Sequence, residues 1–255
     1  MKLIIDSEDQ SLTVVEGEFS STHGLYTKAS FEAISRQWIR IGWSLSYYMN
    51  FSWFGHPVVQ IPEDLIRLQE VVYHVRPDVI VETGIYRGGS LIFHATLCQA
   101  LDRGRVIGID LHIPAPDREA IERHFLAHRI TLIEGNSTSP DIFGRVGDLI
   151  LPGEAVLVLL DSSHTRDHVR CELELYSRLV TSGSYIIVAD GLMRDLVDVP
   201  GGHPEWATDN PLTAAEEFLK SHAEFEQVQP PWPFRSGELT QNVTHWPAGW
   251  LRRRV

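Results

Sequence analysis

The sequence predicts a three-layer α/β domain with a mainly parallel sheet, preceded by an N-terminal helical arm. Three observations lead to this prediction. Several short apolar runs lack the polar alternation of a half-exposed strand, so we expect strands that are buried on both faces. These runs alternate with segments of helical periodicity, which is typical of a parallel sheet covered by helices. A glycine-rich turn joins the first run to the next helix.

The expected elements follow in order along the chain. The first thirty residues are polar and are expected to be irregular. Residues 31–54 are rich in aromatic side chains, and the apolar residues at 31, 34, 38, 41, 45 and 48 fit a helical stripe. Such a stripe is a packing surface, against the main body or a second subunit, or alternatively a substrate wall. Strands are expected at residues 78–83, 105–109, 130–133, 155–160 and 185–188, with a terminal strand within 242–255. Helices are expected at residues 63–75, 90–101, 117–128, 165–180 and 211–222.

The pattern changes after Pro57, which predicts two parts: an N-terminal segment and arm (residues 1–56) and one α/β domain (residues 57–255). The formal charge of −12 argues against a nucleic-acid partner, which needs a basic face. Two cysteines cannot form a disulfide scaffold or a four-thiolate zinc site. The longest apolar run is far shorter than the roughly 20 residues of a membrane span, and the start turns acidic too soon for a signal peptide. We therefore expect a cytoplasmic chain with a small-molecule partner and no membrane partner.

The glycine turn at residues 84–90 lets a ligand approach the backbone and meet a helix N-terminus. Its spacing is neither that of a dinucleotide-binding loop nor that of a phosphate-binding Walker loop. Glu82 just before it would repel a pyrophosphate but suits a cationic ligand, such as the α-ammonium of S-adenosylmethionine. Asp110 ends the next strand, where a carboxylate accepts hydrogen bonds from ribose hydroxyls. Together they favour a nucleoside ligand. The alternatives are NAD, or ordinary turn glycines followed by a helix-capping aspartate.

Three polar side chains follow the fourth and fifth strands of the predicted sheet. Asp161 and Asp190 end these neighbouring strands, so their carboxylates are expected to converge beside the cofactor. Two carboxylates with waters and substrate oxygens suit Mg²⁺. His164, three residues after Asp161, would serve as a general base or as a ligand. The alternatives are that Asp161 caps the following helix and that His164 is a surface residue.

Motifs occur in a fixed order at residues 53–65, 76–84, 88–90, 108–110, 133–137, 160–165, 172–176, 183–185, 210–211, 214 and 218–219. Over roughly positions 50 to 255 they resemble the cephalosporin hydroxylase / rhamnosyl O-methyltransferase family. Despite the hydroxylase label, this family is similar in fold to S-adenosylmethionine-dependent methyltransferases that modify antibiotic and sugar scaffolds. The resemblance therefore implies a Rossmann-like methyltransferase sheet.

The resemblance also implies site residues. The expected cofactor contacts are Glu82, Gly84, Arg87, Ser90, Asp110, Leu111, Ser137 and Asp161. Asp161 and Asp190 are the expected metal ligands. The family commonly carries a Glu-Asp pair at the end of the fifth strand, whereas this chain has Ala189-Asp190. Either Mg²⁺ is held by Asp161 and Asp190, with or without His164, or the enzyme has dispensed with it.

We therefore expect an O-methyltransferase that acts on a hydroxyl of a sugar-bearing or aromatic secondary metabolite. His164 and Asp161 are the expected catalytic residues, and His164 and Trp206 the expected substrate contacts. Trp206 lies in a glycine-containing loop, residues 201–206, that is either a lid or an ordinary surface loop. We also expect a homo-oligomer. The alternatives are an N-methyltransferase, a non-catalytic S-adenosylmethionine-binding subunit of an oxygenase, and an NAD-dependent oxidoreductase.

Overall fold

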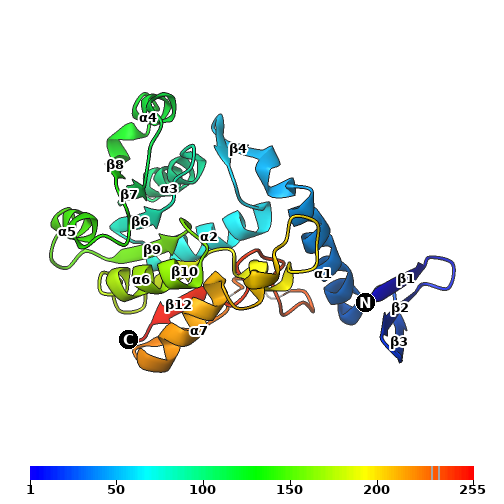
Figure 1. Cartoon of the computed structure of the whole chain (residues 1–255). Coiled ribbons are helices and arrows are strands. Elements are labelled where there is room, and N and C mark those ends of the chain that lie inside the picture. Colours follow the sequence, from blue (N-terminus) through cyan, green and yellow to red (C-terminus); the bar gives the residue numbers. More distant parts are fainter. Residues whose placement is uncertain (231, 235) are drawn as a thin grey trace.

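A seven-stranded sheet forms the centre of the molecule in a computed structural model that describes residues 1–230, 232–234 and 236–255 (Figure 1). The strand order is β11-β12-β10-β9-β6-β7-β8. The strands are β6 (Val79–Thr83), β7 (Arg105–Asp110), β8 (Ile130–Glu134), β9 (Val156–Leu160), β10 (Tyr185–Val188), β11 (Phe225–Gln227) and β12 (Trp250–Arg253). Strands β6 to β10 pair in parallel, and β12 runs antiparallel to both β10 and β11. The mainly parallel sheet is confirmed.

Helices cover both faces of this sheet. The helices α2 (Pro62–Val75), α3 (Gly89–Ala100) and α4 (Ala115–Glu122) contribute to one hydrophobic cluster, and α5 (Pro140–Asp148), α6 (Arg166–Tyr176) and α7 (Pro211–Ser221) to a second. Alternate strand residues enter the two clusters: Ile80 lies in the first, and Val79 and Val81 lie in the second. The three-layer prediction is therefore confirmed. No helix within the described part of the chain is both long and apolar enough to cross a bilayer.

Several predicted helix boundaries were wrong, because periodicity alone marks helix ends poorly. The segment expected at 117–128 divides into α4 and a 3₁₀ turn, η2 (Ala127–Arg129), and α6 ends four residues before position 180. Helix α5 was not predicted. It starts at Pro140 but contains Gly144 and Gly147, which lower helix propensity.

The prediction that the first thirty residues are irregular was wrong. They form an antiparallel meander of β1 (Lys2–Asp6), β2 (Ser11–Glu16) and β3 (Phe19–Gly24), which stands apart from the main body beside α1 (Lys28–Ser44) in Figure 1. The ladder is held by backbone hydrogen bonds, and Leu12 is its one fully buried hydrophobic side chain among the described residues. Apolar periodicity, the main signal for a strand, is therefore weak here.

The helical arm is shorter than predicted. Helix α1 ends at Ser44, and a 3₁₀ turn, η1 (Tyr47–Asn50), and a hairpin of β4 (Phe51–Trp53) and β5 (His56–Val58) follow it. The two turn residues of the hairpin, Phe54 and Gly55, have φ values of +45° and +85°, as a two-residue hairpin turn requires. The aromatic side chains therefore belong to three different elements rather than to one helix.

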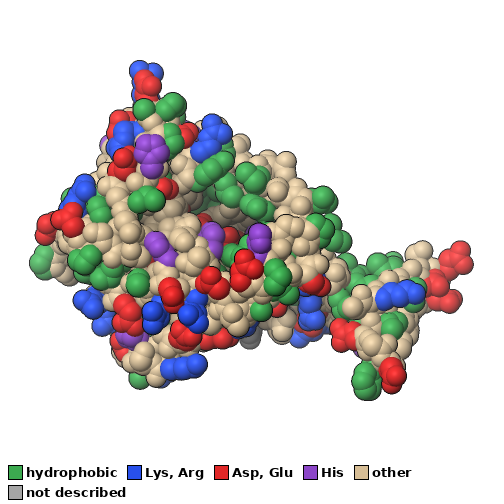
Figure 2. Space-filling model, in the orientation of Figure 1, with side chains coloured by type: hydrophobic (Ala, Val, Ile, Leu, Met, Phe, Trp, Pro, Cys, Tyr) green, Lys and Arg blue, Asp and Glu red, His purple; other side chains and the backbone are tan. Residues whose placement is uncertain are grey.

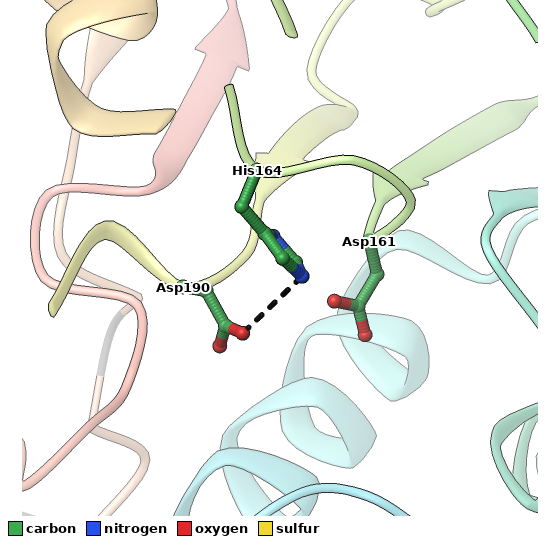
Figure 3. A group of neighbouring side chains, drawn as sticks. All are labelled: Asp161, His164 and Asp190. Carbon is green, nitrogen blue, oxygen red and sulfur yellow. Dashed lines mark ion pairs between the residues drawn. The ribbon is translucent and has the colours of Figure 1, made fainter. Parts of the chain in front are cut away.

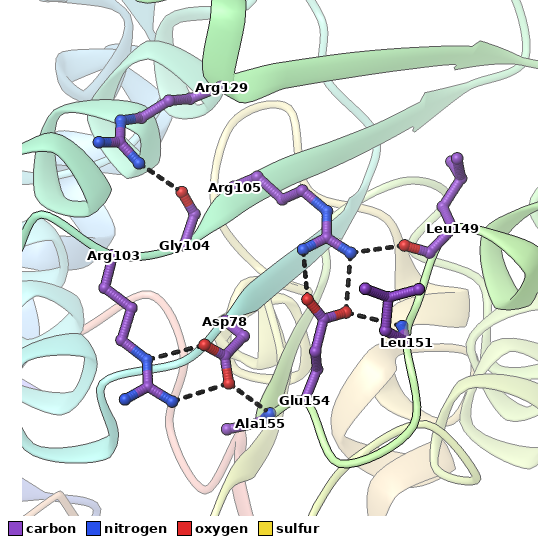
Figure 4. Close-up of polar contacts among 9 residues, drawn as sticks. All are labelled: Asp78, Arg103, Gly104, Arg105, Arg129, Leu149, Leu151, Glu154 and Ala155. Carbon is purple, nitrogen blue, oxygen red and sulfur yellow. Dashed lines mark hydrogen bonds and ion pairs between the residues drawn. The ribbon is translucent and has the colours of Figure 1, made fainter.

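Ion pairs tie the strand starts together at the edge of the sheet opposite the carboxyl ends of the parallel strands (Figure 4). Asp78 accepts two hydrogen bonds of 2.8 Å from Arg103 and one of 2.9 Å from the Ala155 amide. Arg105 binds both carboxylate oxygens of Glu154, at 2.6 and 2.8 Å. The arginines lower the pKa of Asp78 and of Glu154 by hydrogen bonding. These contacts join β6, β7 and β9 at their amino ends, which aligns the carboxyl ends that carry the site.

Candidate functional site

A cavity of about 810 Å³ opens at the carboxyl edge of the sheet, where β6, β7, β8, β9 and β10 end. Figure 2 shows histidine and acidic side chains close together around the hollow on this face. Of the predicted site residues, the cavity is lined by Gly84, Ser90, Asp110, Leu111, Ser137, Asp161, His164, Asp190 and Trp206. The structure therefore brings together residues that lie up to about 120 positions apart in the chain.

The glycine loop is shaped by close backbone contacts. Gly84 has φ +81°, and a Cβ there would lie 2.0 Å from the backbone oxygen of Asp161. A Cβ on Gly89 would lie 2.0 Å from the backbone oxygen of Pro57. Only glycine fits either position, so the loop packs against the residues that follow β9 on one side and against β5 on the other. Both contacts narrow the cavity around the loop.

Asp110 fixes the loop as well as lining the cavity. Its Oδ2 accepts hydrogen bonds from the amides of Ile85, at 2.9 Å, and Tyr86, at 3.2 Å. Its Oδ1 lies 3.3 Å from the amide of His112. The carboxylate therefore sits directly under the turn, in the wall of the cavity.

Two of the expected cofactor contacts lie outside the cavity. Glu82 is 0% exposed and faces His94 of α3, with 3.6 Å between Oε2 and Nε2. Burial raises the pKa of Glu82 to about 8 and lowers the pKa of His94 to about 3, so both are mainly neutral at pH 7. Arg87 points away along the surface, where its Nε lies 3.3 Å from Asp117.

Asp161, His164 and Asp190 converge from the ends of β9 and β10 (Figure 3). One ligand atom from each lies within 4.8 Å of the others, and His164 Nε2 is 3.5 Å from Asp190 Oδ2. The backbone of Asp190 has φ +54°, an unusual conformation that aspartate tolerates and that often marks functional positions. Burial and the neighbouring carboxyls of Asp190 and Glu82 raise the pKa of Asp161 well above its usual range.

This cluster suits a divalent cation. Two carboxylates held close together repel each other, and a cation between them would relieve that repulsion. Ala189, where the family commonly has a glutamate, is 1% exposed and packs in the core with Trp246 and Trp250. The ligand set available here is therefore the two aspartates and the imidazole.

Sequence reasoning missed several residues of the cavity. Trp43, Tyr48 and Met49 come from the arm and the turn after it, and the ring of Trp43 meets that of Trp206 edge-on at 5.4 Å. The aromatic stripe therefore forms part of a cavity wall, which is the placement that its alternative interpretation as a substrate wall requires. Trp206 belongs to a 3₁₀ turn, η4 (Pro204–Ala207), and so reaches the cavity as expected. Gln60, before α2, was also missed, because no periodicity or charge marks it.

A polar network not predicted from the sequence lines the cavity beside Ser137. His168 Nε2 lies 3.2 Å from the hydroxyls of both Ser137 and Ser162. The Ser162 hydroxyl donates to Glu172 of α6 at 2.7 Å. Glu172 is buried and anchors this network through Ser162. The network therefore joins the loops after β8 and β9 to α6.

The comparisons with known proteins identify the family and the fold. The sequence profile described as Rhamnosyl O-methyltransferase/CmcI matches residues 45–254. A rhamnosyl O-methyltransferase of Mycobacterium leprae is 28% identical over 166 residues, covering 62% of this chain and 67% of that protein. The rhamnosyl O-methyltransferase of Mycobacterium bovis is 26% identical over 166 residues, covering 62% of this chain and 66% of that protein. The chain thus spans about two thirds of the length of these relatives.

Two solved structures share the fold. A magnesium and S-adenosylmethionine complex of CmcI has a TM-score of 0.52 and 21% identity, covering 81% of this chain and 78% of that one. MycE, a methyltransferase from the mycinamycin biosynthetic pathway in complex with Mg and SAH, has a TM-score of 0.50 and 18% identity, covering 94% and 66%. The Rossmann-like methyltransferase fold and the resemblance in the motifs are confirmed. This chain is a methyltransferase that belongs to the rhamnosyl O-methyltransferase/CmcI family.

Proposed function

We propose that this enzyme transfers a methyl group from S-adenosylmethionine to a hydroxyl of a sugar-bearing or aromatic secondary metabolite. One observation carries the proposal: the glycine loop, Asp110 and the Asp161–His164–Asp190 cluster line the same cavity. A nucleoside cofactor and a proton-accepting cluster then meet at one place. The rhamnosyl O-methyltransferases among the relatives support a sugar hydroxyl as the acceptor.

The proposed reaction is a single in-line displacement. The acceptor oxygen forms a bond to the methyl carbon while the bond from carbon to sulfur breaks, and S-adenosylhomocysteine leaves with the electron pair. The proton of the hydroxyl goes to His164 Nε2, where the carboxylate of Asp190 at 3.5 Å would stabilise the imidazolium. Holding both reactants in one cavity contributes most of the acceleration, since good positioning is worth roughly 7–11 kcal/mol.

Asp161 and Asp190 would hold Mg²⁺ in this proposal, with the imidazole of His164 beside them. The fit rests on the two closely spaced carboxylates described above. The ion, when bound, would supply Lewis acidity that lowers the pKa of the acceptor hydroxyl. The chain's own part is to orient the carboxylates, and Gln60 contributes to this by donating to Asp161 Oδ2 at 3.3 Å.

The acceptor would lie against the aromatic side of the cavity. Trp43, Tyr48 and Trp206 together offer flat, mainly apolar surfaces with few polar groups, which suits a sugar ring or an aromatic scaffold. Trp206, on the loop at residues 201–206, is proposed to cover the acceptor when it is bound.

We predict that S-adenosylmethionine or S-adenosylhomocysteine binds the purified chain in the micromolar range, roughly −8 kcal/mol. Asp110→Ala should weaken this affinity about 10- to 100-fold, since a charged acceptor of the ribose hydroxyls is lost. Isothermal titration calorimetry measures the affinity of the wild type and that of the variant. Asp141→Ala, an exposed aspartate outside the cavity, is the matched control and should bind like the wild type. Unchanged affinity in Asp110→Ala, or tighter binding of NAD, would contradict the cofactor assignment.

A homo-oligomer is the proposed assembly. Trp38, Ile41 and Leu45 of the arm are large apolar side chains that remain exposed in the single chain, and a second copy would cover them. We expect light scattering at micromolar concentration to give a multiple of 28.9 kDa. Ile41→Arg should shift the mass to that of one chain, whereas Ile66→Arg, exposed on α2, should not. A mass of 28.9 kDa for the wild type would contradict this proposal.

A further inference from the structure

The ammonium group of the cofactor needs an acceptor that Glu82 does not offer. Glu82 is sealed in the layer between the sheet and α3, behind the cavity wall. Its carboxyl oxygens have no hydrogen-bond partner within normal distance among the residues that the structure describes. Its neighbours are the buried, neutral His94 and Ser90, which lies between the carboxyl and the cavity. A ligand in the cavity therefore does not reach this carboxyl.

Gln60 carries such an acceptor in the wall of the cavity, where its amide oxygen is covered by neighbouring atoms. It lies on the connection between β5 and α2, lines the cavity and is only 4% exposed. Its Nε2 donates to Asp161 Oδ2 at 3.3 Å, which leaves the amide oxygen on the other side of the group. Within the described part of the chain this oxygen has no hydrogen-bond partner. A buried, unpaired amide oxygen costs free energy, so an oxygen of this kind in a binding cavity points to a ligand donor.

The position of Gln60 is rigidly defined. Strand β5, which leads directly into the connection that carries Gln60, passes so close to the glycine loop that a Cβ on Gly89 would lie 2.0 Å from the Pro57 oxygen. Val58 and Ile61, on either side of Gln60, are both buried. The amide is therefore held in place over the glycine loop before any ligand binds, which reduces the entropy lost on binding.

The location along the sheet matches the amino-acid end of the cofactor. Asp110, the expected ribose acceptor, ends β7, whereas Asp161, the partner of Gln60, follows β9. Strand β6 with the glycine loop lies between these two strands. A cofactor with its ribose at Asp110 and its sulfonium near the catalytic cluster would therefore place its amino-acid chain beside Gln60 and Asp161.

We propose that Gln60, rather than Glu82, recognises the α-ammonium group of S-adenosylmethionine. The amide oxygen of Gln60 accepts one ammonium hydrogen, and the carboxylate of Asp161 accepts a second. This inference rests on the proposed use of S-adenosylmethionine and adds the residue that distinguishes the complete cofactor from its nucleoside part.

The test compares S-adenosylhomocysteine with 5′-methylthioadenosine, which has the same nucleoside but lacks the amino-acid group. Methionine has a side chain of similar shape to glutamine but no amide oxygen. Calorimetry should show that Gln60→Met weakens the affinity for S-adenosylhomocysteine about 10- to 100-fold and leaves the affinity for 5′-methylthioadenosine nearly unchanged. Glu82→Gln is the matched control and should leave both affinities as in the wild type, because Glu82 lies outside the cavity. Binding of 5′-methylthioadenosine also reports that each variant is folded.

Gln60→Glu separates direct recognition from an effect through Asp161. It keeps an acceptor for the ammonium but loses the amide donor to Asp161, so we expect it to retain the preference for S-adenosylhomocysteine. Loss of that preference in Gln60→Glu, or its retention in Gln60→Met, would overturn the inference. Equal weakening of both ligands in Gln60→Met would overturn it too, since Gln60 would then shape the whole cavity. A wild-type chain that binds neither ligand would instead refute the proposed cofactor.

Discussion

Replacing His164 by alanine should lower the turnover about 10²- to 10⁴-fold while leaving the affinity for S-adenosylhomocysteine unchanged. The imidazole is held by Asp190 at the cavity surface, and no glycine-loop contact depends on it. Its loss should therefore remove the proton acceptor without disturbing the cofactor. Transfer of a labelled methyl group to glycosylated and phenolic acceptors measures the turnover, and calorimetry measures the affinity.

His74→Ala is the matched control, because His74 is exposed on α2 and lies outside the cavity. It should have the turnover of the wild type. Full activity in His164→Ala would mean that Asp161 or solvent removes the proton and that positioning alone accounts for the catalysis. Wild-type chain that binds the cofactor but methylates no acceptor by itself would favour the accessory-subunit alternative.

The parallel core of the fold could be predicted because its strands are buried on both faces. Strand β9 is apolar throughout and β6 is apolar from Val79 to Val81, and burial of that kind leaves a clear signal in the sequence. The positions of Asp110, Asp161 and Asp190 follow from the same signal, since parallel strands place their carboxyl ends at one edge. Residues that end such strands are therefore predictable as neighbours.

The N-terminal meander could not be predicted for the opposite reason. Its strands are mostly exposed and are held together by backbone hydrogen bonds, which any sequence can form. The helical structure of the arm could be predicted, but the length of its helix could not. The aromatic residues that continue past Ser44 have good β propensity too, so composition did not separate a longer helix from the β4–β5 hairpin.

Glu82 shows how strand alternation decides the role of a charged residue. It lies two positions after Ile80, on the face of β6 that meets the cluster formed with α2 and α3. Its side chain therefore enters the helix layer rather than the cavity, although its place before the glycine loop made it a cofactor candidate. Gln60 reaches the cavity from a connection that has no regular periodicity, and only the three-dimensional structure places it next to Asp161.

Removal of divalent metal should abolish methyl transfer, and added Mg²⁺ should restore it. The cation would occupy the space among Asp161, His164 and Asp190, where the ligand atoms lie within 4.8 Å of one another. Asp161→Asn should resemble chelation, because it removes one of the two anionic ligands while keeping the size of the side chain. Calorimetric titration of metal-free protein with MgCl₂ provides a measurement that needs no acceptor substrate.

The matched control for this variant is Asp198→Asn, since Asp198 pairs with Arg40 outside the cavity. It should bind Mg²⁺ like the wild type. With Ala189 in the core, Asp161 and Asp190 are the two carboxylates of the cluster, among the described residues, that would hold the cation. Asp161→Asn would then leave Asp190 as the single anionic ligand, and the loss should be nearly complete. Full activity in the presence of chelator would exclude the metal and leave His164 as the proton acceptor. In that case burial and the neighbouring carboxyls, which raise the pKa of Asp161, would favour its protonated form, and the cluster would act through hydrogen bonds alone.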